Sequence, residues 1–541
     1  MRTLLVPLSA RLIVYTAVVL VTALLLHVFL FWSTSILVAI PLVAFGALAA
    51  IGTHDLIQSR HAVLRNYPLT AHIRFILEGI RPEIRQYFLE SEKDGTPFSR
   101  DKRAIVYQRA KRALDKRPFG TQNDVYASGY EWLHHSIAPK HPAEEQFRVV
   151  VGGSDCVKPY SASIFNISAM SFGALGPNAV RSLNIGAKKG RFAHDTGEGG
   201  CSVYHCEHGG DLIWEIGSGY FGCRKSDGTF CAEKFACTAA QLDQVKMVEL
   251  KLSQGAKPGH GGMLPGAKVT PEIAAARGVP AGVDCISPAR HSAFSTPIEM
   301  MQFIATMRRL SGGKPAGFKR CIGHPWEFLA ICKAMLETGI YPDFIVIDGK
   351  EGGTGAAPLE FVDHLGMPLR EGLNFVHNAL IGINARDRIK LGAAGKIVSA
   401  FDIARVMALG ADWCNSARGF MFALGCIQSQ SCHTDRCPTG VSTQDRTRQR
   451  ALVVADKSER VYNFHRATME SLAELVGAAG LDHPSEFRPA HFLRRVSAHE
   501  VMSFADLYPT LTPGELLAGT ADKRFSTGWA IANPEQFRAA A

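Results

Sequence analysis

The chain has 541 residues, 47% of them hydrophobic and 20% charged, and its formal net charge is +10. This length accommodates two or three domains or one large barrel with additions, and the apolar fraction supports a sizeable core. No run of lysine and arginine with interleaved aromatic residues accompanies the positive charge, so we expect no nucleic-acid partner. Thirteen cysteines in a chain this long do not form a small secreted disulfide framework, which favours a reducing compartment.

Two apolar runs near the N-terminus, 12–32 and 36–51, are separated by the tripeptide Ser-Thr-Ser. Each approaches the length that an α-helix needs to cross a hydrocarbon core of about 30 Å, so residues 1–55 are predicted to form a transmembrane hairpin. Basic residues flank both outer ends, which places these ends and the catalytic part of the chain in the cytoplasm. They are Arg2, Arg11, Arg60 and Arg65. A signal peptide is the alternative, but no convincing cleavage site follows a short apolar run.

Residues 56–150 are predicted to form a helical linker or cap. The segments 81–90 and 100–117 alternate basic and apolar residues at helical spacing. They are expected to be solvated helices that pack on the catalytic domain, and a basic face resting on anionic lipid headgroups is the alternative.

A regular alternation of short β-rich runs and amphipathic helices begins near residue 160. The pattern predicts a (β/α)8 barrel, of the TIM-barrel class, over residues 151–480. A doubly wound sheet is the alternative, but it would normally carry a phosphate loop after its first strand. The predicted strands are 164–170, 191–195, 245–250, 283–287, 316–322, 344–348, 388–393 and 412–417, and the predicted helices are 177–189, 297–310, 325–339, 373–387 and 399–410.

The last three predicted strands are followed by glycine-rich or basic turns. Glycines let backbone amides approach phosphate oxygens, and basic side chains add charge, so these turns predict a phosphate site. The alternative is that the glycines only form βα turns. The candidate residues are Gly352, Gly353, Thr354, Gly355, Gly395, Lys396, Ala417 and Arg418.

Residues 424–444 hold Cys426, Cys432 and Cys437 in a C-x5-C-x4-C array that ends at Pro438. Three thiolates from one loop can each bind one iron of a cubane-like cluster. A zinc site needs a fourth ligand, and His433 is too close to Cys432 to fold back easily. Three buried thiols without a metal are the alternative. A phosphate site beside such a loop points to flavin mononucleotide (FMN) as the phosphorylated cofactor.

Six stretches together resemble the FMN-binding synthase domain of the glutamate synthases, in which the cysteine loop holds a [3Fe–4S] cluster. They are ISAMSFGALG (167–176), TGEGG (196–200), KLSQGAKPGHGGMLPGAKV (251–269), GVDCISPARHS (282–292), EGGTGAAP (351–358) and the cysteine loop. The resemblance implies that FMN lies over Ala169, Met170 and Ser171. It also implies that Glu198, Lys251, Lys257 and Arg277 line the site for 2-oxoglutarate or its imine. Lys251 is further expected close to the flavin, where a cation stabilises the anionic reduced ring.

The chain departs from the large synthases at two positions of this site. His260 stands where they carry an acid, and Met263 where they carry a substrate-contacting glutamine. The chain is more similar to the shorter, stand-alone FMN-binding glutamate synthase family proteins, some of which carry a membrane hairpin. Arg2 follows Met1, so we expect no amidotransferase domain with a processed N-terminal cysteine.

The resemblance therefore implies reductive formation of glutamate from 2-oxoglutarate and ammonia. Electrons are expected from ferredoxin or an NAD(P)H-dependent reductase, through the cluster to FMN. Ammonia is taken directly or comes from a separate amidotransferase subunit. The alternatives are amino transfer as in the N-methylglutamate synthases, and a membrane-associated redox protein without glutamate synthesis.

Two further regions carry weaker signals. Five cysteines between residues 201 and 237 have irregular spacing, which favours ordinary thiols over a second metal site. The helical pattern after residue 445 predicts one or two helices that close the barrel. Residues 481–541 are predicted to be a polar, partly ordered tail.

Overall fold

The computed structural model describes residues 9–540. By its internal contacts the chain forms two compact units, which meet between Arg100 and Asp101. The predicted boundaries at residues 55 and 150 were set by composition alone, whereas the units follow packing.

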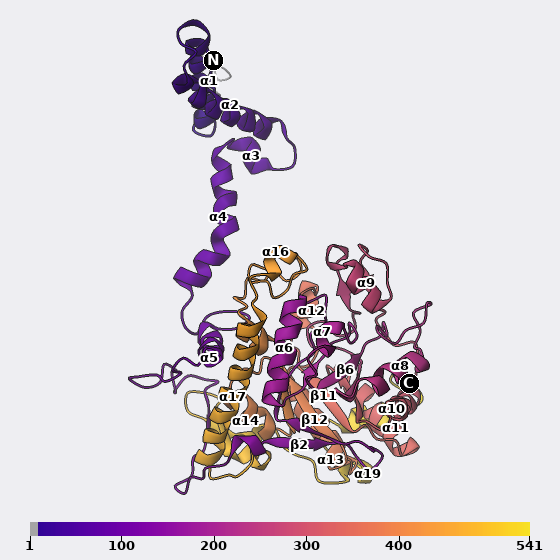
Figure 1. Cartoon of the computed structure of the whole chain (residues 1–541). Helices are drawn as coiled ribbons and strands as arrows, with labels where there is room; N and C mark the ends of the chain where they lie inside the picture. Colours follow the sequence, from indigo (N-terminus) through magenta and orange to yellow (C-terminus); the bar gives the residue numbers. More distant parts are fainter. Residues whose placement is uncertain (1–8, 541) are drawn as a thin grey trace. The chain divides into compact units, whose positions relative to one another are not determined.

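The first unit begins with two long apolar helices, α1 (Ile13–Phe31) and α2 (Ile36–Ile57), which lie side by side (Figure 1). Ser35 ends the turn between them and caps α2, because its Oγ accepts the Leu37 N–H at 3.2 Å. Both helices are long and apolar enough to cross a membrane, and 6% of each apolar window is buried. The predicted pair of helices is confirmed; of the flanking basic residues, Arg2 lies outside the described part of the chain.

Polar contacts fix the end of α2. Asp55 is buried, accepts the Leu69 N–H at 3.1 Å and pairs with His72 at 2.9 Å. These contacts connect α2 to the start of α4 (Thr70–Ile84), which continues as a π-helical turn at Arg85–Leu89. The short helix α3 (Ala62–Asn66) lies between α2 and α4 along the chain. The chain is thus mainly helical after α2 as far as Ala110, whereas residues 111–150 contain the strands β1 (Glu131–Leu133) and most of β2 (Arg148–Val151).

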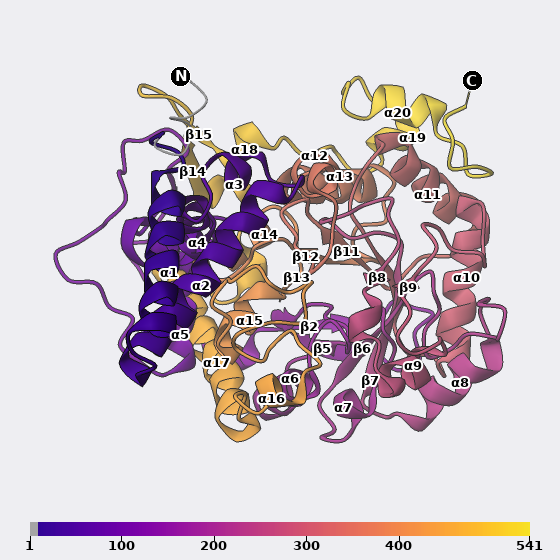
Figure 2. The ribbon, with the colours of Figure 1, turned by 90° about the horizontal axis from the view of Figure 1, so that it is seen from above.

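The second unit is built on a closed barrel of eight parallel strands, as predicted (Figure 2). Neighbouring strands are consecutive along the chain apart from the two-stranded insertion between β7 and β10, as right-handed crossovers through helices produce. The strands are β4 (Phe165–Ile167), β5 (His194–Asp195), β6 (Leu212–Ile216), β7 (Val245–Lys251), β10 (Ala316–Arg320), β11 (Phe344–Asp348), β12 (Lys390–Ala394) and β13 (Trp413–Ser416).

One predicted strand is wrong. Residues 283–287 lie outside the barrel, where β9 (Cys285–Ile286) pairs antiparallel with β8 (Met263–Leu264) and Ile286 is exposed. The third barrel strand is Leu212–Ile216, which lies in the cysteine-containing region 201–237 and was not among the predicted strands. All five of its residues are buried, as expected for a strand covered on both faces.

Helices surround the barrel and begin at strong local signals. Thr296 and Glu299 form a capping box at the start of one helix, and Ser399 and Asp402 form another. The long helix at Val454–Ala478 packs along the helix at Pro177–Gly190, as predicted for a helix that closes the barrel. The longer helices are α6 (Pro177–Gly190), α8 (Ala232–Gln241), α10 (Pro297–Leu310), α11 (Pro325–Thr338), α13 (Leu369–Gly382), α14 (Ala400–Ala408) and α17 (Val454–Ala478).

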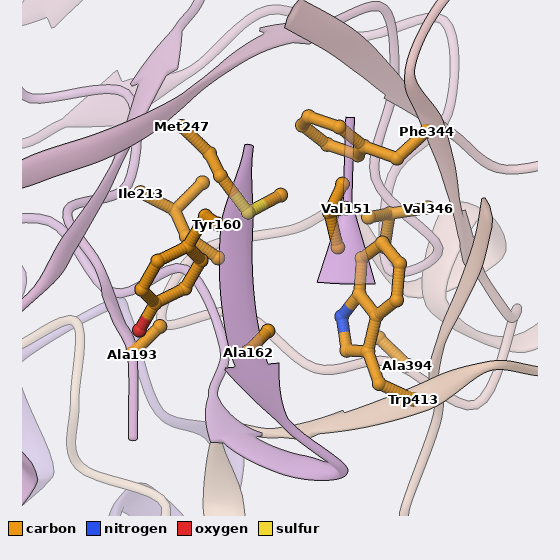
Figure 3. Close-up of a cluster of buried hydrophobic side chains, with 10 residues drawn as sticks. All are labelled: Val151, Tyr160, Ala162, Ala193, Ile213, Met247, Phe344, Val346, Ala394 and Trp413. Carbon is orange, nitrogen blue, oxygen red and sulfur yellow. The ribbon is translucent and has the colours of Figure 1, made fainter. Parts of the chain in front are cut away.

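The amino-terminal end of the barrel is filled by apolar side chains. The hairpin of β2 (Arg148–Val151) and β3 (Tyr160–Ser163) supplies three of them, and barrel strands and the turns beside them supply the rest (Figure 3). Side chains two residues apart on a strand point to the same face, so the residue two positions beyond each of these apolar strand residues also points into the barrel. The ten residues are Val151, Tyr160, Ala162, Ala193, Ile213, Met247, Phe344, Val346, Ala394 and Trp413.

The last sixty residues are not the predicted polar tail. β14 (Phe492–Arg495) pairs with β1 (Glu131–Leu133) and with β15 (Val501–Ser503). Phe525 is buried and stacks on Phe375 of α13 at 5.1 Å between ring centroids. The apolar residues of this C-terminal segment do not recur with the period of a helix or a strand. Their burial therefore could not be predicted from a hydrophobic pattern.

Candidate active site at the carboxyl ends of the strands

A buried ionic cluster lies beyond the ends of β5 and β7. Glu198 follows β5, Lys251 ends β7, and the Lys251 Nζ lies 3.0 Å from the Glu198 Oε1. Burial raises the pKa of Glu198, but the charges of Lys251, Arg277 and Lys257 outweigh it and leave this pKa below its usual value. The structure therefore brings together the four residues proposed for the substrate site, as one carboxylate facing three cations.

The backbone leaves little space around the Glu198 carboxylate. A Cβ added at Gly217 or at Gly262 would lie 2.9 Å from the Glu198 Oε2. Both glycines belong to segments that close over this loop, so a larger residue at either position would displace the carboxylate from Lys251.

Arg277 ends the short helix α9 (Pro271–Arg277) and is 5% exposed. Its Nη2 donates to the Phe172 carbonyl at 3.0 Å, and its guanidinium lies 5.1 Å from the centre of the Phe221 ring. Its Nε is buried and has no hydrogen-bond partner within residues 9–540. A buried guanidinium N–H without an acceptor is suited to a ligand carboxylate.

The loop after β4 contacts this cluster. The Gly199 N–H donates to the Ser171 Oγ at 3.2 Å, and Met170 is buried. The segment Ala169–Ser171, predicted to lie beneath a flavin, thus adjoins the loop that carries Glu198.

The predicted phosphate residues occupy the ends of three adjacent strands, β11, β12 and β13. Gly353 lies against Arg418, since a Cβ added there would be 2.8 Å from the Arg418 Nη2. Lys396 has a left-handed backbone with φ of 51°. Burial lowers the pKa of Lys396, and Glu351 acts in the opposite direction.

The cysteine loop begins where α15 (Arg418–Leu424) ends and turns sharply at several non-glycine residues with positive φ, among them Gln428 and Asp435. Burial raises the pKa of Cys426 to about 11. Burial also acts to raise the pKa of Cys437, but hydrogen bonds from Thr439 and nearby backbone amides outweigh it and lower this pKa. The loop therefore stabilises a thiolate at Cys437 before any metal is considered.

The cysteine loop packs on the other two loops. Ser442 Oγ donates to the Ala174 carbonyl at 2.7 Å, and the buried Lys268 Nζ donates to the carbonyls of Ala174 and Cys432 at 3.1 and 3.3 Å. A Cβ added at Gly355 would lie 3.4 Å from the Cys432 Cβ. The predicted phosphate loop, flavin loop and cysteine loop are therefore contiguous.

Within residues 9–540, one set of three His, Cys, Asp or Glu residues has ligand atoms that all lie within 4.8 Å of one another: Asp195, Glu215 and Glu249. The three cysteines of the loop do not form such a set in this part of the chain.

The sequence analysis missed a histidine beside this site. His291 contacts the Lys251 carbonyl through Nε2 at 2.8 Å and the Tyr220 hydroxyl through Nδ1 at 3.1 Å. Burial lowers the pKa of His291 to about 4, so the ring is neutral near pH 7. His291 lies in the stretch 282–292, whose resemblance to the synthases was the available signal.

Comparisons with known proteins identify the family of the chain. Residues 141–482 match the family model described as the conserved region in glutamate synthase. The glutamate synthase large subunit-like protein YerD of Bacillus subtilis (strain 168) is 38% identical over 514 residues, which cover 87% of this chain and 96% of that protein.

Two relatives of similar length match the central part of the chain. The archaeal-type glutamate synthase [NADPH] of Thermotoga neapolitana is 33% identical over 335 residues, 62% of each chain. The archaeal glutamate synthase [NADPH] of Methanocaldococcus jannaschii is 34% identical over 323 residues, 60% of each chain. The chain thus spans nearly all of YerD but less than two thirds of the archaeal-type enzymes, and it belongs to the family defined by the conserved region of glutamate synthase.

Proposed function

We propose that the chain is an FMN and iron–sulfur oxidoreductase that forms glutamate reductively from 2-oxoglutarate and ammonia. The observation that carries the proposal is the convergence of Lys251, Lys257 and Arg277 on Glu198 beside Ser171. Three cations around one carboxylate leave an excess of positive charge for a dicarboxylate substrate. The family relatives named glutamate synthases support the same activity.

The residues at the ends of β11, β12 and β13 fit FMN. Gly353 leaves no side chain between its backbone and Arg418, and Lys396 adds a second cation for a phosphate, partly offset by Glu351. Ala169, Met170 and Ser171 would support the flavin ring. When bound, FMN would supply hydride transfer to a carbon–nitrogen double bond.

The donor set of the cysteine loop fits a [3Fe–4S] cluster, with Cys426, Cys432 and Cys437 as ligands. The lowered pKa of Cys437 favours the thiolate that iron needs. When bound, the cluster would supply one-electron transfer.

The side chains of the site would bind and orient the substrate. Arg277, with its unpartnered Nε, and Lys257 would hold the carboxylates, while Glu198 fixes the Lys251 ammonium by an ion pair at 3.0 Å. His291 fixes the backbone of Lys251. Because Lys257 and Arg277 are already buried and Lys251 is already held by Glu198, little reorganisation is needed when substrate arrives.

We further propose that α1 and α2 anchor the chain in a membrane with the barrel in the cytoplasm. Their length, apolarity and exposed side chains support this. A ferredoxin or an NAD(P)H-dependent reductase would supply electrons, and free ammonia or a separate amidotransferase subunit would supply nitrogen.

The test is an assay of the purified full-length chain with chemically reduced ferredoxin, 2-oxoglutarate and one nitrogen source at a time. Glutamate formed from ammonium, and not from glutamine alone, is expected. N-methylglutamate formed from methylamine and glutamate would favour amino transfer instead. This alternative is tested because Met263 and His260, which differ from the residues of the large synthases, are both exposed; the exposed fraction of Met263 is 42%. No product from either mixture with both cofactors bound would contradict the proposal.

A further inference from the structure

Three buried carboxyl groups meet inside the barrel, next to the apolar side chains that fill its amino-terminal end. They belong to Asp195 on β5, Glu215 on β6 and Glu249 on β7, and each lies two residues beyond an alanine, isoleucine or methionine of that apolar set. Their side chains are at most 1% exposed, and one oxygen of each lies within 4.8 Å of the others.

Two lysines face this acid cluster, Asp195–Glu215–Glu249, and one of them, Lys251, also reaches the substrate site. Lys319 on β10 pairs with Glu215 and lies 3.4 Å from the Glu249 Oε1. Lys251 lies 3.8 Å from the Glu215 Oε1 and 3.0 Å from the Glu198 Oε1. The charged groups that face the acid cluster are thus Lys319, Lys251 and, on β11, Asp348.

The acid cluster has more carboxyl groups than compensating charge. Lys251 is already paired with Glu198, which leaves Lys319 against three carboxyl groups, and Asp348 adds a fourth acid nearby. Burial and the neighbouring acids raise the pKa of Asp195 to about 7 and hold the pKa of Glu249 well above its usual value. Like charges this close cannot all ionise away from water, so at least one proton is retained near neutral pH.

The hydrogen-bonding pattern agrees with a retained proton. Both oxygens of Glu249, Oε1 of Glu215 and Oδ2 of Asp195 have no hydrogen-bond partner within residues 9–540. A protonated carboxyl donates to a neighbouring carboxylate and would satisfy two of these atoms at once. A divalent cation fits less well, because the Lys319 ammonium already lies among the same oxygens.

We propose that the acid cluster is a proton reserve for the reduction at the barrel mouth, with Lys251 as the group that delivers the proton. This inference rests on the proposed function and deepens it. Synthesis of glutamate and water from 2-oxoglutarate and ammonium takes up two electrons and two protons. The electrons come from the external donor, so protons must reach a buried site separately.

The transfer proceeds in two steps. An N–H bond of the Lys251 ammonium breaks as its proton passes to the substrate nitrogen, leaving a neutral amine. The O–H bond of the protonated carboxyl group in the acid cluster then breaks, and its proton passes by way of the Glu215 Oε1, 3.8 Å from the Lys251 Nζ, to form a new N–H bond on Lys251. The negative charge stays in the acid cluster. Solvent supplies the second proton and refills the acid cluster between turnovers.

The first measurement is infrared spectroscopy of the full-length holoenzyme without substrate, in water and in deuterium oxide. We expect a protonated-carboxyl band at pH 7 that shifts on deuteration and is lost in Glu249→Gln, because two carboxylates can then ionise beside Lys319. Asp195→Asn, which should also lose the band, serves if Glu249→Gln does not fold. Glu327→Gln is the matched control: Glu327 pairs with Arg320, next to Lys319, outside the acid cluster.

The second measurement is steady-state kinetics. Loss of a positioned acid typically costs on the order of 10²-fold, so we expect Glu249→Gln to lower kcat by about that factor, with KM for 2-oxoglutarate unchanged and a larger solvent isotope effect. Absence of the protonated-carboxyl band between pH 6 and 8, or its loss on adding Mg²⁺ alone, would refute the proposal that the acid cluster holds a proton for the reduction. Absence of glutamate synthesis with the band present would instead refute the proposed function.

Discussion

Lys257 is 3% exposed, and its charge acts on Glu198 within the candidate substrate site. Removing a cation that stabilises developing charge commonly costs 10²-fold or more in rate, so Lys257→Met should lower kcat/KM for 2-oxoglutarate by about that factor. Lys246→Met is the control, because Lys246 lies on β7, the strand that precedes the loop of Lys257, but its side chain is 37% exposed and lies 4.0 Å from its partner Asp211. Equal activity of the two variants would exclude Lys257 from the site.

Cys432 is the central residue of the cysteine loop and adjoins Gly355. Cys432→Ser should lose iron and inorganic sulfide while FMN stays largely bound, since a serine oxygen is a poor ligand for these irons. Metal and sulfide analysis with the visible spectrum measures this, and Cys237→Ser, at an exposed cysteine, should change neither. Zinc without sulfide in the unaltered protein would refute the iron–sulfur assignment.

Gly353 tests the phosphate site. An added methyl group would lie 2.8 Å from the Arg418 Nη2 and force this guanidinium aside. Overpacking typically costs about 1–3 kcal/mol, so Gly353→Ala should raise the Kd for FMN roughly 10- to 100-fold. Gly323→Ala is the control, because a Cβ there meets nothing within 4 Å. Unchanged FMN binding in a titration of the Gly353 variant would place the phosphate elsewhere.

At the scale of the elements, α14 is held at its first turn by a buried carboxylate. Asp402 accepts from Lys102 of α5 (Arg100–Ala110) at 2.9 Å and from Arg405 at 3.1 Å. Burial acts to raise the pKa of Asp402, but Lys102, Arg405 and Ser399 outweigh it and lower this pKa to about 2. The pKa in the unfolded chain is about 3.9, so the carboxylate stabilises the fold above that pH, and the contribution is lost as the pH falls toward 2.

Asp402→Asn should therefore lower the free energy of unfolding by about 2 kcal/mol at pH 7, with a smaller difference at pH 3.5. Thermal and denaturant unfolding at both pH values measure this. Asp456→Asn, which removes a half-exposed acid from the first turn of α17, should cost less than about 1 kcal/mol. If Asp402→Asn lowered the free energy of unfolding equally at both pH values, the altered side-chain packing, and not the lost charge, would be responsible.

At the scale of the whole molecule, the two apolar helices and the barrel belong to separate compact units. Deleting residues 1–57 should give a protein that is soluble without detergent and retains flavin, because the exposed apolar side chains of α1 and α2 are removed. The full-length chain, as the control, should sediment with membranes and need detergent. A full-length chain that is soluble alone, or a C-terminal reporter outside the cytoplasm, would contradict the membrane anchor.

The sequence by itself determined the features that local chemistry specifies. Seven of the eight barrel strands were predicted from short β-rich runs, and several helices begin at a proline or a capping box, such as Thr296 with Glu299. The cysteine spacing and the glycine-flanked Glu198 are equally local, so these candidate residues were identified before any packing was known.

Only the tertiary structure decided which similar runs enter the barrel and which charges face one another. Residues 212–216 and 283–287 are both short and apolar, but only the first finds a parallel strand on each side. Asp195, Glu215 and Glu249 each look like a single acid in an apolar strand. Their shared position appears only when three strands align, because a carboxyl group's environment is set by neighbours from distant parts of the chain.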